Sequence, residues 1–430
     1  PLWLHRFWLV VLWVVFTLAG ALALTKRIKP EHFWLGFGLT SWFTLFVFSG
    51  PVYFQLMVVI IIVLLGFNKN KLARSLIYVM IASLWAGICR INWFPVAGAL
   101  AVTLYVLEIP VAGKNFFQYW GWPILATFSG LLFSLGSNAV YIMISGRSLD
   151  GFVSSLNSPL LIYRLFPNDA FGPGILALLL VAIFPLLIVI IWHLLPNYRS
   201  WHILRLVALF GILAVFLVGG LIVSMKIGGG NNLHNLDAFL VLLAVVMAYL
   251  LFNCFVPDDY SFYKKRKIPI LMVILLGLIP VAFLVDSIKP YPTLDQARAW
   301  DDVEKIQSLI DEMVPEDGEV LFIHNRHLLT FNMIEGVDLI PEYEKVFLME
   351  MAMSETESYL DRFKQDLETH RFSMIITEPL YLGIKPRSAI FSEENNVWVV
   401  HVAIPLDESY ETIFVSHESA MAVMVPKTGD

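Results

Sequence analysis

Residues 203–256 read ILRLVALFGILAVFLVGGLIVSMKIGGGNNLHNLDAFLVLLAVVMAYLLFNCFV, and this stretch decides the fold class. Two apolar runs, 203–224 and 237–256, lie on either side of the polar run KIGGGNNLHNLD at 226–237. A membrane-spanning helix needs about 20 consecutive apolar residues, which is close to the length of each run. The stretch therefore predicts two membrane spans joined by a short polar connection.

The same apolar character extends over most of the chain. Of its 430 residues, 58% are hydrophobic, which is more than an ordinary soluble domain contains. Residues 1–286 are therefore predicted to form a polytopic α-helical membrane domain with about 10 transmembrane helices. The ten segments, of which the third to fifth are short, are 6–24, 33–50, 52–67, 76–90, 93–107, 118–137, 173–195, 203–224, 237–256 and 268–286.

Charge divides the chain into two domains. Residues 1–286 carry 18 Lys and Arg against 8 Asp and Glu, whereas residues 287–430 carry 11 against 27. Such an acidic tail disfavours nucleic-acid binding. We expect a basic membrane domain over 1–286 and a soluble acidic domain over 287–430.

The tail alternates helical and strand patterns. Residues 295–314 and 346–370 have a helical period, and 319–323, 372–380 and 397–404 have the composition of strands. This alternation predicts a small α/β domain.

Short basic segments predict the orientation in the membrane. If all ten segments cross the membrane, four basic segments lie on the same side of it. They are TKRIKPEH (25–32), NKNKLAR (68–74), NYRSWHILR (197–205) and YKKRK (263–267). Lys and Arg in short loops mark the cytoplasmic side. The N-terminus, the polar run 226–237 and the acidic domain are then extracytoplasmic, on the outer face of a plasma (inner) membrane.

The polar run 226–237 is the first candidate site. Its glycines, Gly228, Gly229 and Gly230, permit sharp turns and close approach of backbone amides to a ligand. Lys226 ends the preceding helix, where its ammonium can pair with a phosphate. His234 and Asp237 are three residues apart and share a face if the next helix has begun. The alternative is a glycine turn with a snorkelling lysine and a helix-capping Asn235.

The segment CRINWFP, 89–95, is the second candidate. Arg90 lies between two apolar segments and is followed by Asn92 and Trp93. An outward guanidinium at headgroup level can clamp a lipid phosphate. The alternative is an interfacial arginine beside an aromatic-belt tryptophan.

The long segment 145–172 is the third candidate. It carries two carboxylates, Asp150 and Asp169, together with Arg147 and Arg164. Loops of this length are usually functional or re-entrant. Outward Arg, Lys and His with few acids together describe a site for an anionic, lipid-embedded headgroup such as a polyprenyl-phosphate sugar.

In the tail, polar residues follow the predicted strand 319–323. His324, Arg326 and His327 lie at a strand end, where α/β domains commonly bind ligands. The alternative is that they are surface residues without a ligand.

These motifs resemble those of the multi-spanning GT-C glycosyltransferase-like proteins. The similarity is to uncharacterised bacterial members related to protein mannosyltransferases and lipid A aminoarabinose transferases. It is carried by CRINWFP, SSLNSPLLIYRLFPN, KIGGGNNLHNLD, EVLFI, LLTF, PEYEK and RFSMIITEPL.

The resemblance implies an inverting sugar transfer from a polyprenyl-phosphate donor to an acceptor glycan, lipid or protein on the outer face. The family's catalytic carboxylate lies in the first outward loop after the first helix. We therefore expect the base upstream of Pro1, in a first helix and loop that the chain lacks. Within the chain, the candidates for the base are Asp150 and Asp169.

Such a transfer needs cations that stabilise the phosphate leaving group. We expect Arg90, Lys226, His234 and the three glycines to bind the donor phosphate. A divalent cation, Mg or Mn, is optional in this superfamily. The residues expected in supporting roles are Asn92, Arg164 and Asp237.

Two other classes of function remain open. A non-catalytic membrane scaffold or lipid-binding subunit of a larger complex would keep the fold and bind lipids without sugar transfer. A transporter would carry polar residues on both membrane faces and is disfavoured because the candidates cluster on one.

Overall fold

The structure is a computed structural model of the chain. It describes every residue except Pro51, Ala112, 146–156, Phe171, 228–232, 289–294, His417 and 428–430. The chain forms two compact units. The helical unit comprises Leu4–Arg147 and Leu160–Lys289, and the sheet unit comprises Pro290–Asp430 with Pro1–Trp3 and Ser148–Pro159. The division at Lys289 lies beside the change in charge at residue 287.

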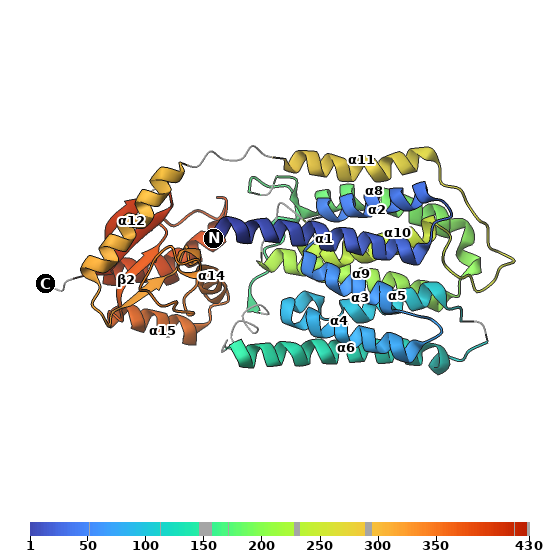
Figure 1. Ribbon diagram of the computed structural model, residues 1–430, viewed down its shortest axis with the longest axis horizontal. Helices are drawn as coiled ribbons and strands as arrows, with labels where there is room; N and C mark the ends of the chain where they lie inside the picture. Colours follow the sequence, from blue (N-terminus) through green and yellow to red (C-terminus); the bar gives the residue numbers. More distant parts are fainter. Residues whose placement is uncertain are drawn as a thin grey trace. The chain divides into compact units, whose positions relative to one another are not determined.

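The described part of the helical unit contains ten apolar helices that run roughly along one direction (Figure 1). Each corresponds to one predicted apolar segment. The helices are α1 (Leu2–Ile28), α2 (Phe33–Ser49), α3 (Phe54–Gly66), α4 (Leu72–Cys89), α5 (Val96–Glu108), α6 (Phe116–Ser145), α8 (Gly174–Asn197), α9 (Ile203–Ile227), α10 (Asp237–Leu251) and α11 (Ile270–Ser287).

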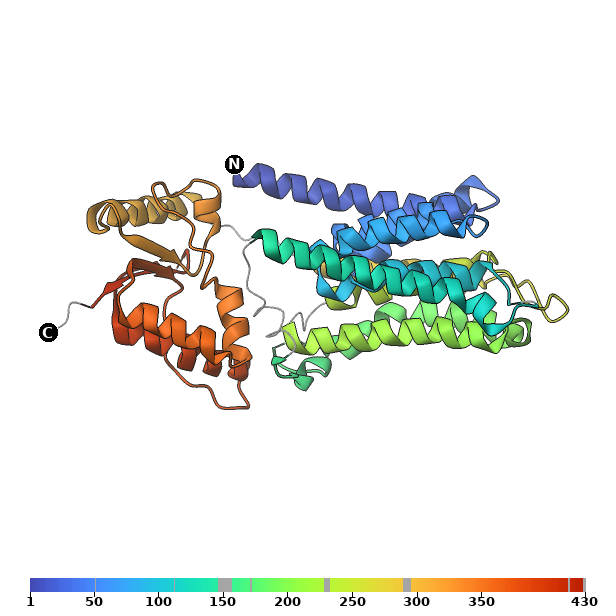
Figure 2. The same cartoon turned by 90° about the horizontal axis from the view of Figure 1, so that it is seen from below.

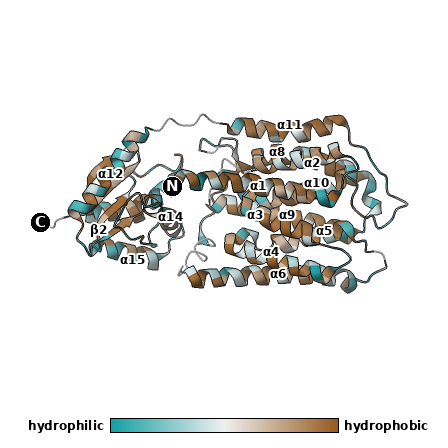
Figure 3. Ribbon diagram, in the orientation of Figure 1, coloured by the Kyte–Doolittle hydropathy of each residue, from teal (hydrophilic) through white to brown (hydrophobic). Residues whose placement is uncertain are grey.

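Seven of these helices, three of them counted with an adjoining turn, are long and apolar enough to cross a membrane. They are α1, α4, α5, α6, α8, α9 and α10, whereas α2, α3 and α11 are shorter. Figure 3 shows that apolar residues predominate in the helices of this unit. The apolar helices thus agree with the predicted membrane character. Seven of the ten reach the length and composition of a span, and whether the three shorter apolar helices also cross stays a prediction.

Hydrogen bonds join the four basic segments in pairs. Arg27 donates to the carbonyl of Phe67 at 2.9 Å, which joins the end of α1 to the segment before α4. Asn197 donates to the carbonyl of Lys264 at 3.1 Å, which joins the end of α8 to the segment before α11.

The last turn of α5 connects these two pairs. Arg27 forms an ion pair with Glu108 at 2.6 Å. The fully buried Arg205 donates to the carbonyl of Val106 at 2.8 Å and forms an ion pair with Asp258 at 2.7 Å. The four basic segments therefore lie at one end of the bundle, as a common membrane side requires.

The sheet unit has a four-stranded sheet in the order β1-β2-β4-β3. Strands β1 (Glu319–Phe322) and β2 (Phe372–Thr377) are parallel, and β4 (Met421–Pro426) is antiparallel to β2 and to β3 (Tyr410–Ser416). The mixed sheet confirms an α/β domain. The helices are α12 (Gln296–Met313), α13 (His327–Thr330), α14 (Lys345–Met353), α15 (Glu357–Glu368), α16 (Ser392–Trp398) and α17 (Ile404–Ser409).

Both faces of this sheet are covered by helices. Val320 and Phe322 of β1 pack in a core with Ile306 of α12. Leu321, which points to the opposite face, packs in a second core with Phe363 of α15. Figure 2 shows the sheet between α12 and the later helices.

The predicted helix over 346–370 is wrong in one respect, because two helices occupy this range. Helix α14 ends at Met353, and Glu355 adopts a left-handed conformation with φ 50°. The amide of Thr356 then donates to the carbonyl of Met351 at 3.0 Å. This is the hydrogen bond of a Schellman helix end.

The predicted strand over 397–404 is also wrong, because these residues are helical. Helix α16 continues through a π-helical turn, Val399–Ala403, into α17. The buried positions Val399, Val402, Ala403 and Leu406 follow the spacing of a helix rather than that of a strand. Strands β3 and β4 were missed.

Candidate functional site

Two of the polar segments selected from the sequence meet at one end of the helical unit. Arg90 lies between α4 and the 3-10 turn Ile91–Trp93, and His234–Leu236 forms a second 3-10 turn before α10. The Arg90 Nη2 donates to Asn235 Oδ1 at 3.3 Å. The indole Nε1 of Trp93 donates to both carboxylate oxygens of Asp237, at 3.0 and 3.2 Å.

Local backbone geometry places these side chains. Helix α4 ends at Cys89 because Arg90 is extended, with φ −155° and ψ 138°. Pro95 then directly precedes the first turn of α5, where a proline needs no amide hydrogen. Asp237 is the first residue of α10, and its Oδ1 accepts from the amide of Ala238 at 2.7 Å. A carboxylate at this position interacts favourably with the helix dipole.

Aromatic rings flank the Arg90 guanidinium. Its Cζ lies 4.9 Å from the ring centre of Tyr53 and 5.5 Å from that of Trp93. The ring of His234 meets the Tyr53 ring edge-on at 6.0 Å. Cation–π contacts of this kind hold a guanidinium in place without neutralising its charge. Residues Tyr53, Arg90, Trp93, His234, Asn235 and Asp237 are called the Arg90 cluster below.

The Arg90 cluster has one open donor. The Nη1 of Arg90 is buried and has no hydrogen-bond partner among the described residues. A buried guanidinium nitrogen without a partner is costly, so a bound acceptor would stabilise it. Phosphate and carboxylate oxygens are the acceptors that a guanidinium fits best.

Asp237 has a structural role in this cluster. None of its surface is exposed, and the Trp93 indole and the Ala238 amide occupy its oxygens. Asp237 therefore connects the starts of α5 and α10. The N-cap of α10 is Leu236 rather than Asn235, and the Asn235 side chain accepts from Arg90.

Other predicted residues lie in segments around the end of α9. Lys226 is half-buried in its last turn. The amide of Leu161 donates to the carbonyl of Met225 at 3.1 Å, so the 3-10 turn Ile162–Leu165, with the buried Arg164, packs against the same helix end. Asn92 is half-buried beside Trp93.

The remaining predicted residues lie outside the Arg90 cluster or outside the described residues. Asp169 is exposed in the turn that follows Ile162–Leu165. Gly228, Gly229, Gly230, Arg147 and Asp150 lie outside the described residues. In the described part of the chain, no group of three or more His, Cys, Asp or Glu could hold a metal ion.

Sequence reasoning missed Tyr53 and Gly220. A Cβ on Gly220, in α9, would lie 2.6 Å from Leu236 Cδ2 and 2.9 Å from the carbonyl of Asn235. The glycine therefore lets the His234–Leu236 turn pack directly on α9. Tyr53 follows a Gly-Pro pair at the start of an apolar segment, which is a signal only for an interfacial aromatic residue.

An apolar groove of about 620 Å³ lies between α4 and α6. Ile88, two residues before Arg90, lines it, so the groove reaches the end of α4 that carries the Arg90 cluster. Its other apolar lining residues include Leu84, Leu132, Phe133, Val140 and Ile144.

In the sheet unit, His324 and Arg326 lie at the carboxyl end of β1. The His324 Nε2 lies 3.5 Å from Glu378 Oε1, and Lys345 forms an ion pair with the same oxygen. Arg326 donates to the carbonyls of Phe322 at 2.7 Å and of Pro341 at 3.1 Å. Arg326 therefore holds the segment 341–345 against the end of β1, which is a structural role.

The chain matches no known family model, no curated protein and no solved structure.

Proposed function

We propose that the protein is a membrane glycosyltransferase that takes its sugar from a polyprenyl-phosphate donor at the outer membrane face. The observation that carries the proposal is the open Nη1 donor of Arg90, held between aromatic rings at the end of the bundle. A lipid-linked phosphate has a negative charge and acceptor oxygens that suit the Arg90 guanidinium, and it lies at the depth of the membrane surface.

Each part of the polyprenyl-phosphate sugar would meet a matching feature at this end of the bundle. Arg90 would bind the phosphate, and Lys226 and His234 would add positive charge or hydrogen bonds. The groove between α4 and α6 offers an apolar path for the polyprenyl chain. In an inverting transfer, the bond from the anomeric carbon to the phosphate oxygen breaks while a bond to the acceptor forms. Arg90 would stabilise the charge that develops on the leaving phosphate.

The acceptor must lose a proton to a base during this reaction. Asp169 is exposed and is a candidate for the base, as is Asp150. The domain that follows α11 would then be extracytoplasmic, in a plasma (inner) membrane. The acceptor would be a glycan, lipid or protein.

The second candidate is a non-catalytic lipid-binding subunit of a larger membrane complex. The observation that favours it is the burial of Asp237, the only carboxylate in the Arg90 cluster as described. A site that has a hydrogen-bond donor for a phosphate but no accessible base would bind a lipid phosphate without transferring a sugar.

A transfer assay distinguishes the two candidates. The full chain in nanodiscs receives a panel of polyprenyl-phosphate-linked hexoses and a membrane extract as the source of acceptors, and the release of polyprenyl phosphate is measured. The transferase releases it, and Arg90→Ala lowers the rate about 100-fold, as the loss of a single donor to a developing anion does elsewhere.

The matched control is Arg74→Ala, since Arg74 is exposed in the first turn of the same helix and donates to Tyr78. This variant should keep the wild-type rate. Donor binding without release by the wild-type protein, at every sugar tested, would support the second candidate instead.

A further inference from the structure

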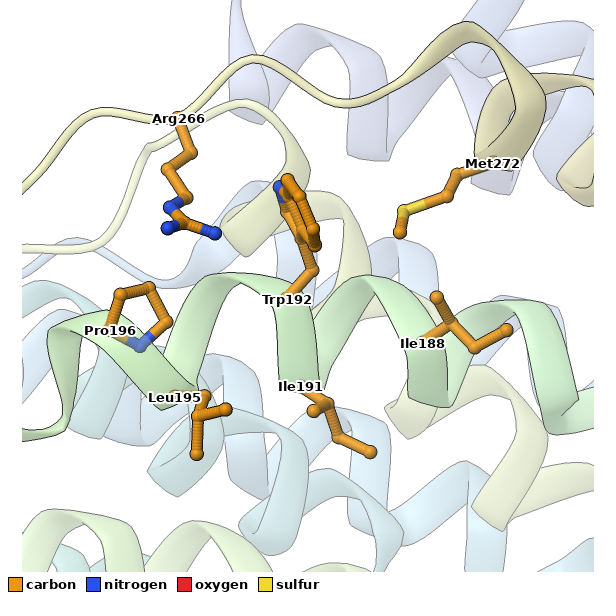
Figure 4. A pocket seen from close by; sticks show the side chains of 7 residues that line it. All are labelled: Ile188, Ile191, Trp192, Leu195, Pro196, Arg266 and Met272. Carbon is orange, nitrogen blue, oxygen red and sulfur yellow. The ribbon is translucent and has the colours of Figure 1, made fainter.

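A second apolar groove, of about 380 Å³, lies at the basic end of the helical unit (Figure 4). It is lined along α8 by Ile188, Ile191, Leu195 and Pro196, and by Met272 of α11. Ile191 and Leu195 are exposed on α8, which is long and apolar enough to cross a membrane. In a membrane, this groove would face lipid chains rather than water.

One cation lies at the groove. Figure 4 shows the side chain of Arg266 reaching toward Trp192, and its Cζ lies 4.7 Å from the Trp192 ring centre. Within the part of the chain that the structure describes, Arg266 forms no ion pair with a carboxylate. Among the described residues, the carboxylate that forms an ion pair with this segment is Glu31, and it pairs with Lys265 at 3.8 Å rather than with Arg266.

The position of Arg266 is fixed by the fold. The buried side chain of Asn197 accepts from the amide of Lys264 at 2.7 Å and donates to its carbonyl at 3.1 Å. Tyr263 donates to Asn253 at 2.9 Å. The Asn197 bonds hold the segment before Arg266 against the end of α8, and the Tyr263 bond holds it against the residues that follow α10. The guanidinium is therefore pre-organised above the groove.

Charge and depth identify the occupant. Lys264, Lys265 and Lys267 surround Arg266 in the sequence and are exposed, so the local field favours an anion. Basic pockets between transmembrane helices on one membrane side bind anionic lipid headgroups. An acyl chain would fill the space beside Ile188 and Met272 while a phosphate meets Arg266.

We propose that this groove binds one anionic phospholipid of the surrounding bilayer, with its phosphate on Arg266 and an acyl chain between α8 and α11. The site is separate from the Arg90 cluster, because it lies at the end of α8 that joins the basic segments. It does not depend on whether the protein transfers a sugar.

The test is native mass spectrometry of the full chain released from nanodiscs that contain phosphatidylglycerol and phosphatidylcholine. The wild-type protein should retain one phosphatidylglycerol in preference to phosphatidylcholine. Arg266→Gln should lower that retention about tenfold or more, since it removes a charged hydrogen bond. Equal retention of the two lipids by the wild-type protein would overturn the proposal.

Two further variants make the result specific. Arg199→Gln is the matched control, because Arg199 also stacks on an aromatic ring, that of Tyr198, but does not line the groove. It should retain lipid like the wild type, and an equal loss in both arginine variants would show a diffuse basic surface instead. Ile191→Trp fills the groove from an exposed position and should lower retention with all charges intact. Unchanged retention in this variant would contradict the acyl-chain placement.

Discussion

At the scale of single residues, the hydrogen bonds of Trp93 define the Arg90 cluster. Trp93 is buried, with 1% of its surface exposed, and its indole is a donor to the fully buried Asp237. Asp237 in turn marks the first residue of α10. The tryptophan therefore couples two helix starts through one carboxylate.

Trp93→Phe should destabilise the protein because it leaves that carboxylate with one donor fewer. We expect the free energy of unfolding in detergent to fall by about 1–3 kcal/mol more than in the control. The control is Trp201→Phe, since Trp201 is also buried but its indole nitrogen has no partner among the described residues. Equal losses in the two variants would contradict the role of the Trp93–Asp237 bond.

His324 gives the sheet unit a pH dependence. Burial lowers the pKa of its imidazole, the Glu378 and Glu344 carboxylates oppose this shift, and Lys345 adds to it. The unfolded chain therefore takes up a proton near its ordinary value of about 6.5, before the folded chain does. Because the unfolded state then binds more protons, stability falls as the pH decreases through that range.

His324→Gln should flatten this dependence. The measurement is hydrogen exchange of the β1 and β2 amides in the full chain between about pH 5 and 8, corrected for intrinsic exchange. Wild-type protection should decrease toward acid more than protection in the variant. His401→Gln is the control, because His401 lies in the helical segment after α16. If His324→Gln kept the wild-type slope, the assignment would be wrong.

At the scale of elements, helix packing depends on positions that the sequence marks weakly. In α9, Gly219 and Gly220 are adjacent, yet only Gly220 is in close contact with the His234–Leu236 turn. A Cβ on Gly219 would meet nothing within 4 Å. A substitution at Gly219 is therefore a matched control for the same substitution at Gly220.

Gly220→Val should displace the His234–Leu236 turn and separate Asn235 from Arg90. We expect a lower thermal midpoint and weaker binding of polyprenyl phosphate by the full chain, as overpacking typically costs about 1–3 kcal/mol. Gly219→Val should leave both quantities near the wild-type values. The packing described for α9 would be refuted by two variants that behave alike.

The helices of the bundle were predictable because apolar length is a strong signal. Every expected segment is a helix, and seven of them, three counted with an adjoining turn, reach the length of a span. The sheet unit was harder. Strand β3 is an edge strand with mostly exposed residues, so it lacks an apolar run, and the apolar run over 397–404 belongs to helices.

The candidate site was predictable in part. Arg90 and the 226–237 run could be selected because polar residues between apolar segments are conspicuous. Their hydrogen bond, and the positions of Tyr53 and Gly220, could not be predicted because they depend on how α3, α4, α9 and α10 pack. No sequence pattern encodes contacts between residues 145 positions apart, such as Arg90 and Asn235.

At the scale of the whole molecule, the ends of the helical unit differ in charge. The basic segments lie at one end, and the Arg90 cluster lies at the other ends of α4 and α10. Helix α11 begins beside the basic segment 263–267 and runs to Ser287, away from it. The positive-inside rule then predicts that the Arg90 cluster and the end of α11 face the extracytoplasmic side.

Labelling of intact cells with a membrane-impermeant thiol reagent tests this topology. Single cysteines replace Asp169, Lys364 or Ser261, all of them exposed, in a chain with Cys89 and Cys254 changed to serine. The first two should react in intact cells, and Ser261→Cys should react only after permeabilisation. Reaction of Ser261→Cys from outside would reverse the orientation.

Both candidate functions depend on recognition of a lipid-linked phosphate by Arg90. The most direct measurement is the affinity of the full chain in nanodiscs for polyprenyl phosphate and for the uncharged polyprenol. The wild-type protein and Arg74→Ala should prefer the phosphate, and Arg90→Ala should lose about tenfold or more of that preference, since a charged hydrogen bond contributes roughly 1.5–3 kcal/mol. An unchanged preference in Arg90→Ala would contradict the account.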